Sequence, residues 1–139
     1  MKRDRDDTDF RSLAAEYDYR QPNCDFCELP TTRVIAENQL ALVIEDAYPV
    51  TKGHTLIIPK RHVADYFDLR QAEINAVFSL LKEARANLLA QDTSIKGFNS
   101  GANSGAVAGQ TVFHCHIHLI PRREGDTKKQ VGGIRNVIE

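Results

Sequence analysis

The sequence predicts an α+β domain in which one long helix covers an antiparallel sheet. Short β-rich segments are joined by brief turns, one stretch has helical spacing, and no βαβ unit repeats as in a parallel sheet. The chain has 139 residues, of which 42% are hydrophobic and 27% charged, so we expect one globular domain with its own core. We assign residues 1–20 to a charged, mobile arm and residues 21–139 to that domain.

Three strands are expected in the first half of the chain. Segments 33–36 and 40–44 are apolar and lie three residues apart, a spacing typical of a β-hairpin with a short loop. Segment 46–53 contains a proline and a glycine and should be a connection. Segment 54–59 is β-rich and ends on proline, which predicts a third strand.

The second half predicts one helix and two more strands. Asp68 with Gln71 resembles an N-cap and its capping-box partner, and the helix should run to Gln91. Its apolar residues recur at helical spacing: Ile74, Val77, Phe78, Leu81 and Leu88. Segment 97–109 is rich in small and amide residues and predicts a fourth strand that enters a loop of close backbone approach. Segment 111–120 predicts the last strand, which the following proline ends.

Composition and charge limit the function classes. The net charge of −1 argues against a nucleic-acid coat, and no apolar run reaches the ~20 residues of a membrane span. The charged N-terminus lacks the apolar stretch of a signal peptide. Three cysteines in a reducing compartment are not expected to form a structural disulfide. We therefore expect a cytoplasmic protein with no nucleic-acid or membrane partner.

His114, His116 and His118 alternate with apolar residues near the C-terminus. Because residues two apart on a strand share a face, the sequence predicts one row of imidazoles with successive Cα atoms about 6–7 Å apart. The apolar residues that would face the core are Phe113, Cys115, Ile117 and Leu119. One buried histidine is an ordinary core residue, whereas three histidines in register on one face indicate a catalytic or metal-binding site.

Two chemistries suit such a row: a catalytic metal, or a histidine nucleophile whose neighbours manage protons and charge. Neither an accompanying carboxylate nor an HxxEH helix supports a catalytic metal. Phosphoryl chemistry fits the preceding residues, because glycines let backbone N–H groups approach an anion while amide and hydroxyl donors complete a cradle. Those residues are Gly105, Gly109, Gln110 and Thr111.

Segment 103–123, NSGAVAGQTVFHCHIHLIPRR, resembles the signature of the histidine-triad family, His-φ-His-φ-His-φ-φ preceded by Ala-Gly-Gln-x-Val. The resemblance extends from about Cys24 to the tail 132–135, which is similar to that of bacterial members. It implies a sheet of about five antiparallel strands with a long helix and short helical segments. It also implies a homodimer in which two sheets join into one of ten strands.

The resemblance implies roles for single residues. His116 would be the nucleophile that forms a nucleotidyl-histidine intermediate, and His118 would contact the phosphate or help to protonate the leaving group. Asp46, eight residues before the substrate-side His54, would bind the ribose hydroxyls, although aspartate is also an ordinary turn residue. The other substrate-binding residues would be Asn103, Gly109, Gln110 and Thr111, with phosphate oxygens bound by Asn103 and Thr111.

Cys24 and Cys27 form a CxxC motif, which alone is compatible with a zinc half-site, a redox pair or coincidence. A redox pair would need a thioredoxin-like βαβ context, which is absent. Histidine-triad proteins with this motif bind zinc through two cysteines and two histidines, which match His62 and His114 here. Such a set would be a closed, structural zinc site. The alternative for His62 is an ordinary surface histidine.

The resemblance predicts a hydrolase that cleaves adenylylated substrates at the α-phosphate, with water resolving the nucleotidyl-His116 intermediate. The leaving group stays open between dinucleoside polyphosphates, phosphoramidates and nucleotide esters. The segment Pro121-Arg122-Arg123 after the triad resembles the dinucleoside-polyphosphate branch, of the fragile-histidine-triad type, where cations would suit a long polyphosphate. One alternative is a nucleotidyltransferase, although that branch replaces the third histidine by glutamine. Another is a regulatory nucleotide-binding module with little turnover.

Overall fold

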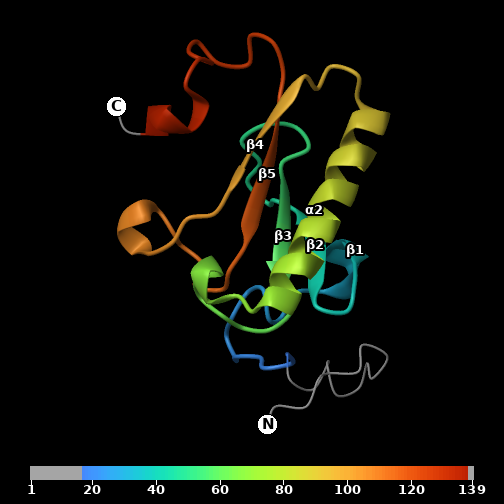
Figure 1. Cartoon of the computed structure of the whole chain (residues 1–139), viewed down its shortest axis with the longest axis vertical. Coiled ribbons are helices and arrows are strands. Elements are labelled where there is room, and N and C mark those ends of the chain that lie inside the picture. Colours follow the sequence, from blue (N-terminus) through green and yellow to red (C-terminus); the bar gives the residue numbers. More distant parts are fainter. Residues whose placement is uncertain (1–16, 138–139) are drawn as a thin grey trace.

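A computed structural model describes residues 17–137, in which five strands form one antiparallel sheet in the order β1-β2-β3-β5-β4 (Figure 1). The strands are β1 (Val34–Glu37), β2 (Ala41–Glu45), β3 (Thr55–Pro59), β4 (Gly97–Gly101) and β5 (Ile117–Arg122). Helix α2 (Gln71–Gln91) packs mainly against β2 and β3. Short 3-10 segments are η1 (Thr31–Arg33), η2 (Tyr66–Asp68), η3 (Ala106–Ala108) and η4 (Gly133–Val137). The α+β class and the five antiparallel strands are confirmed.

The predicted arm, residues 1–20, lies largely outside the described part of the chain. Its last residues do pack on the domain: Tyr17 is buried beneath the Arg70 guanidinium, and the Tyr19 carbonyl accepts a hydrogen bond from the His62 N–H at 2.7 Å. Within residues 17–137, no helix is both long and apolar enough to cross a bilayer.

The predicted hairpin is present, with boundaries shifted by one residue. Asn38 closes its turn, because the side-chain oxygen accepts hydrogen bonds from the N–H groups of Leu40 (3.1 Å) and Ala41 (2.9 Å). The same side chain donates to the Ala76 carbonyl of α2 at 2.9 Å. One asparagine therefore sets the turn and ties it to the helix.

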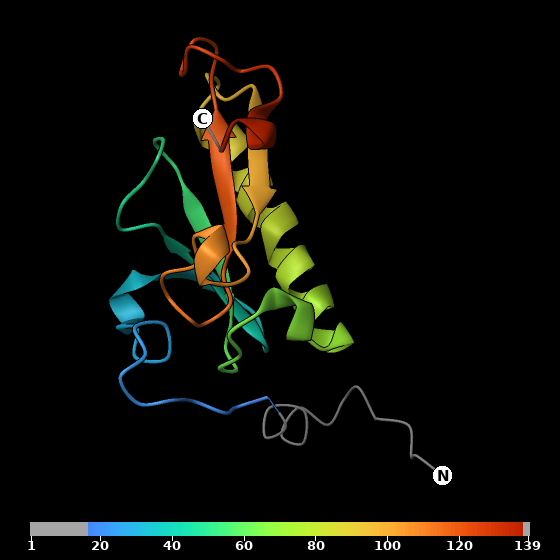
Figure 2. The same cartoon turned by 90° about the vertical axis from the view of Figure 1, so that its left-hand side faces the viewer.

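The alternation of strand residues gives the sheet two apolar faces. The face under α2 holds a core made of Ala41, Val43, Ile57, Val77, Leu80 and Leu119. The opposite face holds Ile44, Leu56 and Ile58, covered by Phe26 and Leu29 from the segment before β1. Figure 2 shows α2 on one side of the sheet and η1 on the other. Each fully buried aliphatic side chain contributes roughly 1.5–3 kcal/mol, so both faces stabilise the sheet.

The predicted start of the helix is wrong. Asp68 lies in η2, and the N-cap residue of α2 is Arg70. Its N–H donates to the Glu73 carboxylate at 2.9 Å, which makes Glu73 the capping partner in place of Gln71. Glu73 is also held by the Arg61 guanidinium at 2.7 and 2.9 Å. This long-range pair, which local sequence does not reveal, fixes where the helix begins.

The predicted last strand is also wrong in its extent, since β5 begins at Ile117 and includes Pro121 and Arg122. Residues before it turn away because the Cys115 N–H donates to the Val63 carbonyl rather than to a neighbouring strand. Pro121 is tolerated opposite Phe98, and its carbonyl accepts a hydrogen bond from the Thr51 hydroxyl at 2.7 Å. The three triad histidines therefore do not form one row along a strand.

The apolar residues between those histidines also divide. Cys115 and Leu119 are buried and Ile117 packs against the core under α2, as expected. Phe113 is 51% exposed, because it precedes the strand and lies in the loop. On α2, Val77 is buried, but Ile74 and Phe78 are exposed, so the apolar stripe is wider than the face the sheet covers.

Candidate active site and zinc-ligand cluster

A cavity of about 800 Å³ opens on the sheet face opposite α2, where His118 of β5 lies beside Leu56 of β3. Its apolar lining includes Phe26, Leu29, Pro30, Val50, Leu56 and Val112. Its polar lining includes Asp46, His54, Asn103, Thr111, His116 and His118, with Gly109 beside them. The cavity thus brings together the predicted catalytic and substrate-binding residues, except Gln110.

The His116 ring has its proton placed by the backbone. Its Nδ1 lies 2.8 Å from the carbonyl oxygen of His114, an acceptor, so Nδ1 carries the hydrogen. In the neutral ring the lone pair is then on Nε2. The ring also meets the edge of Phe26, at 5.1 Å between centroids. His116 therefore lines the cavity, and its Nε2 makes no hydrogen bond to another residue within the described part of the chain.

A backbone hydrogen bond to His54 also determines which ring nitrogen of His118 carries the proton. The Val50 N–H donates to His54 Nδ1 at 3.0 Å, so the proton of the neutral His54 ring is on Nε2. That Nε2 lies 2.9 Å from His118 Nδ1 and 3.3 Å from the Asp46 carboxylate. His118 Nδ1 is then an acceptor, and His118 keeps its own proton on Nε2. A backbone amide thus leaves His118 with an N–H to donate.

Burial keeps this histidine pair neutral. It lowers the pKa of His118 to about 4, with smaller contributions from His116 and His54, while Asp46 acts in the opposite direction. Burial also lowers the pKa of His54, which is 3% exposed, and Asp46 again opposes the shift. At neutral pH the pair therefore acts through hydrogen bonds rather than as a positive charge.

The loop before the triad is shaped by glycines and by Gln110. Gly105 and Gly109 have φ of +94° and +100°, conformations that favour glycine. Gln110 is 5% exposed; its side-chain oxygen accepts from the Gly105 N–H at 2.9 Å, and its side-chain nitrogen donates to the carbonyls of Ala64 and Val112. The Gln110 amide is thus occupied by backbone groups and lies outside the cavity lining.

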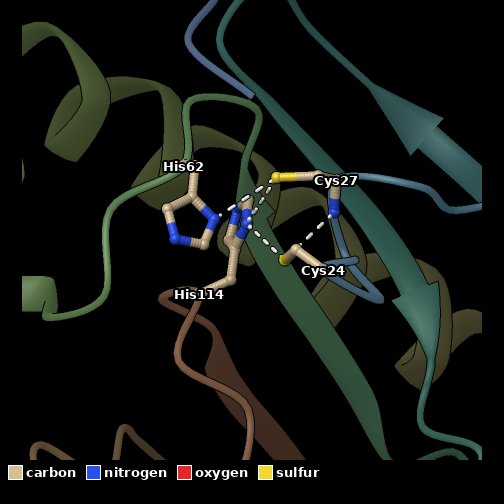
Figure 3. Close-up of side chains that lie close together, drawn as sticks. All are labelled: Cys24, Cys27, His62 and His114. Atoms are coloured by element: carbon tan, nitrogen blue, oxygen red, sulfur yellow. Dashed lines mark hydrogen bonds between the residues drawn. The ribbon is translucent and has the colours of Figure 1, made fainter. Parts of the chain in front are cut away.

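Cys24, Cys27, His62 and His114 gather beside the cavity, where they come from three separate segments (Figure 3). His114 Nδ1 lies 3.5 Å from Cys24 Sγ and 3.4 Å from Cys27 Sγ, and His62 Nδ1 lies 3.3 Å from Cys27 Sγ. Tetrahedral zinc with its usual bond lengths places sulfur and nitrogen ligands about 3.5 Å apart. The four ligand atoms fit such an ion.

The surroundings of this cluster also suit a metal. His114 is fully buried, and its Nε2 donates to the Pro59 carbonyl at 2.7 Å, which leaves the Nδ1 lone pair facing the sulfur atoms. Burial lowers the pKa of His114 to about 4, so the ring is neutral, as a ligand must be. The Gln21 N–H donates to Cys27 Sγ at 3.3 Å.

The cavity differs from the sequence-based expectation in two respects: two arginines expected near the phosphate are absent from its lining, and one aromatic residue of the lining was not expected. Arg122 pairs with Asp126 at 2.8 Å and Arg123 with Asp92 at 2.8 Å, and neither arginine lines the cavity. Sequence reasoning also missed Phe26, whose ring contacts both His114 and His116. Its position inside the CxxC motif was the available signal.

The sequence model of the HIT domain matches residues 28–125. This chain belongs to the HIT family. It is 36% identical over 113 residues to adenylylsulfatase HINT3 of Arabidopsis thaliana, a match that covers 76% of this chain and 55% of that protein.

Solved HIT structures share the fold. A HIT family protein from Bacillus anthracis, 38% identical, superposes with a TM-score of 0.70 over 77% of this chain and 78% of its own. A zinc-bound histidine triad family protein from Mycobacterium smegmatis, 34% identical, gives a TM-score of 0.66 over 78% of this chain and 81% of its own. These similarities confirm the family expected from the triad motif.

Proposed function

We propose that this HIT protein hydrolyses adenylylated nucleotides at the α-phosphate through a covalent intermediate on His116. The observation that carries the proposal is the hydrogen-bond arrangement of the histidine rings in the cavity, which fixes their tautomers. His116 has its Nε2 lone pair free because Nδ1 donates to the His114 carbonyl, while His118 keeps an N–H beside it. The two rings are 5.2 Å apart between centroids, which is close enough for a nucleophile and a hydrogen-bond donor to reach the same phosphate.

The reaction then has two displacements. His116 Nε2 forms a bond to phosphorus as the bond to the leaving atom breaks, and the His118 N–H donates to the phosphate or to the leaving group. Water next attacks phosphorus, the phosphorus–nitrogen bond breaks, and His116 is restored. Overall, water supplies the hydroxyl kept by the nucleotide and the proton kept by the leaving group.

The remaining cavity residues bind the nucleotide. Asn103, Thr111 and backbone N–H groups near Gly109 stabilise charge on the phosphate oxygens, a contribution that is usually large in such catalysis. Asp46 binds the ribose hydroxyls; its carboxylate is held by the Tyr48 N–H at 2.8 Å. Phe26 and other apolar residues receive the base, and adenine is proposed because one relative is an adenylylsulfatase. Gln110 shapes the loop rather than contacting the phosphate.

The charges around the cavity favour a compact leaving group. The lining carries Asp25, Glu28 and Asp46 against the single arginine Arg33, whose guanidinium donates to the Glu45 carbonyl at 3.0 Å. Within residues 17–137, the lining offers a long polyphosphate no lysine and only this one arginine. We therefore favour phosphoramidates or adenylyl sulfate over dinucleoside polyphosphates.

Two further proposals concern the assembly. Cys24, Cys27, His62 and His114 hold one structural zinc, which fixes His114 and so the chain entering His116; the zinc-bound neighbour supports this. A homodimer would pair the β4 edges of two sheets. Phe78 of α2 is exposed in the single subunit, which is consistent with a face that the partner subunit would cover. Cytoplasmic location and the absence of a nucleic-acid partner stay predictions.

A turnover panel tests the function. Purified protein is given an adenosine phosphoramidate, adenylyl sulfate and diadenosine triphosphate, and the products are separated by chromatography. AMP should be released fastest from one of the first two substrates. Equal or faster cleavage of diadenosine triphosphate would contradict the proposed leaving group, and no cleavage of any substrate would contradict the function.

A further inference from the structure

The segment 104–115, which leads into the triad and is called the triad loop here, is held at three points by three consecutive residues, 63–65. The Cys115 N–H donates to the Val63 carbonyl at 2.7 Å, and the Gln110 side chain donates to the Ala64 carbonyl at 2.7 Å. The Ser104 hydroxyl donates to the Asp65 carboxylate. The first two contacts use backbone acceptors, so the third is the one that depends on a side chain of this segment.

Both oxygens of Asp65 are committed. One accepts the Phe67 N–H at 2.9 Å and so caps η2, and the other accepts the Ser104 hydroxyl. These two hydrogen bonds, the Ser104 one first, lower the pKa of Asp65, so the carboxylate is ionised at neutral pH. A carboxylate fixed at one oxygen by the backbone is a rigid acceptor for Ser104 at the other.

Asn103, the neighbour of Ser104, lines the catalytic cavity. Its side chain makes no hydrogen bond to any other residue in the part of the chain described by the structure. It packs beside Gly109, where an added Cβ would lie 3.6 Å from the Asn103 side-chain nitrogen. The place of this amide is therefore set by packing and by the backbone that leads to it.

We propose that Ser104, anchored by its hydrogen bond to Asp65, is a positioning residue for the Asn103 amide. The inference rests on the proposed role of Asn103 as a phosphate ligand. A donor held in place before the substrate arrives stabilises the transition state without reorganising, whereas a mobile amide must first be ordered. Anchoring the next residue to a rigid carboxylate supplies that order.

A double-mutant cycle of Ser104→Ala with Asn103→Ala tests the proposal. Ser104→Ala should lower kcat about tenfold, less than the 10²–10³ typical of losing a whole oxyanion donor. In the Asn103→Ala background the same change should have an effect below about twofold, because the group it positions is gone. Ser104→Thr keeps the hydroxyl and should restore most of the activity.

The chain offers a matched control. Ser94 donates to Asp92 at 2.6 Å in a similar aspartate–serine contact outside the cavity, so Ser94→Ala should leave kcat unchanged. If Ser104→Ala fails to fold, Ser104→Cys retains the side-chain volume with a weaker donor and should show the same coupling. Equal losses in both backgrounds, or wild-type kcat in Ser104→Ala, would overturn the proposal.

The cycle can also be read in AMP affinity by calorimetry, which requires no turnover. If the wild-type protein cleaves no adenylylated substrate, the proposed function fails while the affinity cycle still tests the positioning. Coupling of Ser104 to Asn103 in AMP affinity would then support the inference, and additive effects would overturn it.

Discussion

Residues 17–137 hold two clusters that contain histidines, one of four residues and one of three, and they differ in the backbone group that hydrogen-bonds to a histidine ring. In the cluster of Cys24, Cys27, His62 and His114, the His114 ring donates to a carbonyl and turns a lone pair toward the sulfur atoms. In the cluster of Asp46, His54 and His118, the His54 ring accepts from an amide and turns its proton toward its neighbours.

This difference in hydrogen bonding supports the different roles that we propose for the two clusters. A metal-bound histidine normally donates its second ring N–H, which His114 does toward the Pro59 carbonyl. His54 has no such hydrogen, because the Val50 N–H occupies its Nδ1. Within each cluster the possible ligand atoms lie within 4.8 Å of one another, but the hydrogen bonds of the second cluster favour a hydrogen-bonded relay over a metal site. Residue type and proximity alone would not separate the two.

The largest effect is expected from His116→Ala. Because loss of a nucleophile removes a reaction path, turnover should fall by about 10⁴ or more. AMP affinity, measured by calorimetry, should stay near that of wild type, and so should the zinc content, since His116 belongs to neither cluster. Activity within tenfold of wild type would remove His116 from the nucleophile role.

The cluster that contains Cys24 and Cys27 should differ from the other cluster in binding zinc and in stabilising the folded protein through that zinc. Protein purified without added metal should contain about one zinc per chain by elemental analysis, and Cys27→Ser should lose it and melt at lower temperature. Cys115→Ala is the matched control, because burial raises the pKa of the Cys115 thiol to about 12 and the side chain lies outside the cluster. Metal-free wild-type protein with unchanged melting would contradict the zinc site.

His54→Ala should have a smaller effect, about 10–100-fold on kcat, because His118 loses the donor that fixes its tautomer. His54→Gln retains a side-chain N–H and should recover part of the loss. If the second cluster is a relay, excess zinc should leave the wild-type protein with one tightly bound ion in equilibrium dialysis. A second bound zinc in the wild-type protein that is absent from His54→Ala would show that the second cluster also binds metal, and would contradict the proposed difference between the clusters.

The smallest effect is a pH dependence of stability from His118. Its folded pKa of about 4 lies below the ordinary histidine value, so below about pH 6.5 the unfolded chain binds a proton that the folded protein does not. The free energy of unfolding should therefore fall as pH drops from about 6.5 to 4, by on the order of 1 kcal/mol, since solvent screens part of the ring. In urea denaturation, His118→Gln should lose less stability over this range than wild type; equal losses would contradict the assignment.

Much of this organisation was predictable from local sequence. Alternation and turn residues predicted the hairpin and β3, and the resemblance to the histidine-triad family, carried by the triad and the CxxC motif, indicated the residues of both clusters. Contacts between distant segments were not predictable. The start of α2 depends on Arg61 reaching Glu73, and the bend before β5 depends on Cys115 meeting Val63.

The fates of individual polar residues show the same limit. Gln110 looked like a phosphate donor, but its amide serves the backbone of Gly105 and Ala64. Arg122 and Arg123 looked like polyphosphate ligands, but each pairs with an aspartate. A motif reveals which groups are present, whereas the fold decides which of them are already engaged.

The covalent mechanism is tested most directly by measuring the mass of the intact protein during turnover. His118→Ala, which removes a donor to the same phosphate that water attacks in the second displacement, is mixed with an adenylylated substrate. The reaction is quenched under alkaline conditions, because a phosphorus–imidazole bond is acid-labile. Intact-protein mass spectrometry should show a gain of one adenylyl group, and peptide mapping should place it on His116. No adduct at any time, together with inversion at a chiral phosphorothioate, would show direct attack by water and contradict the covalent mechanism.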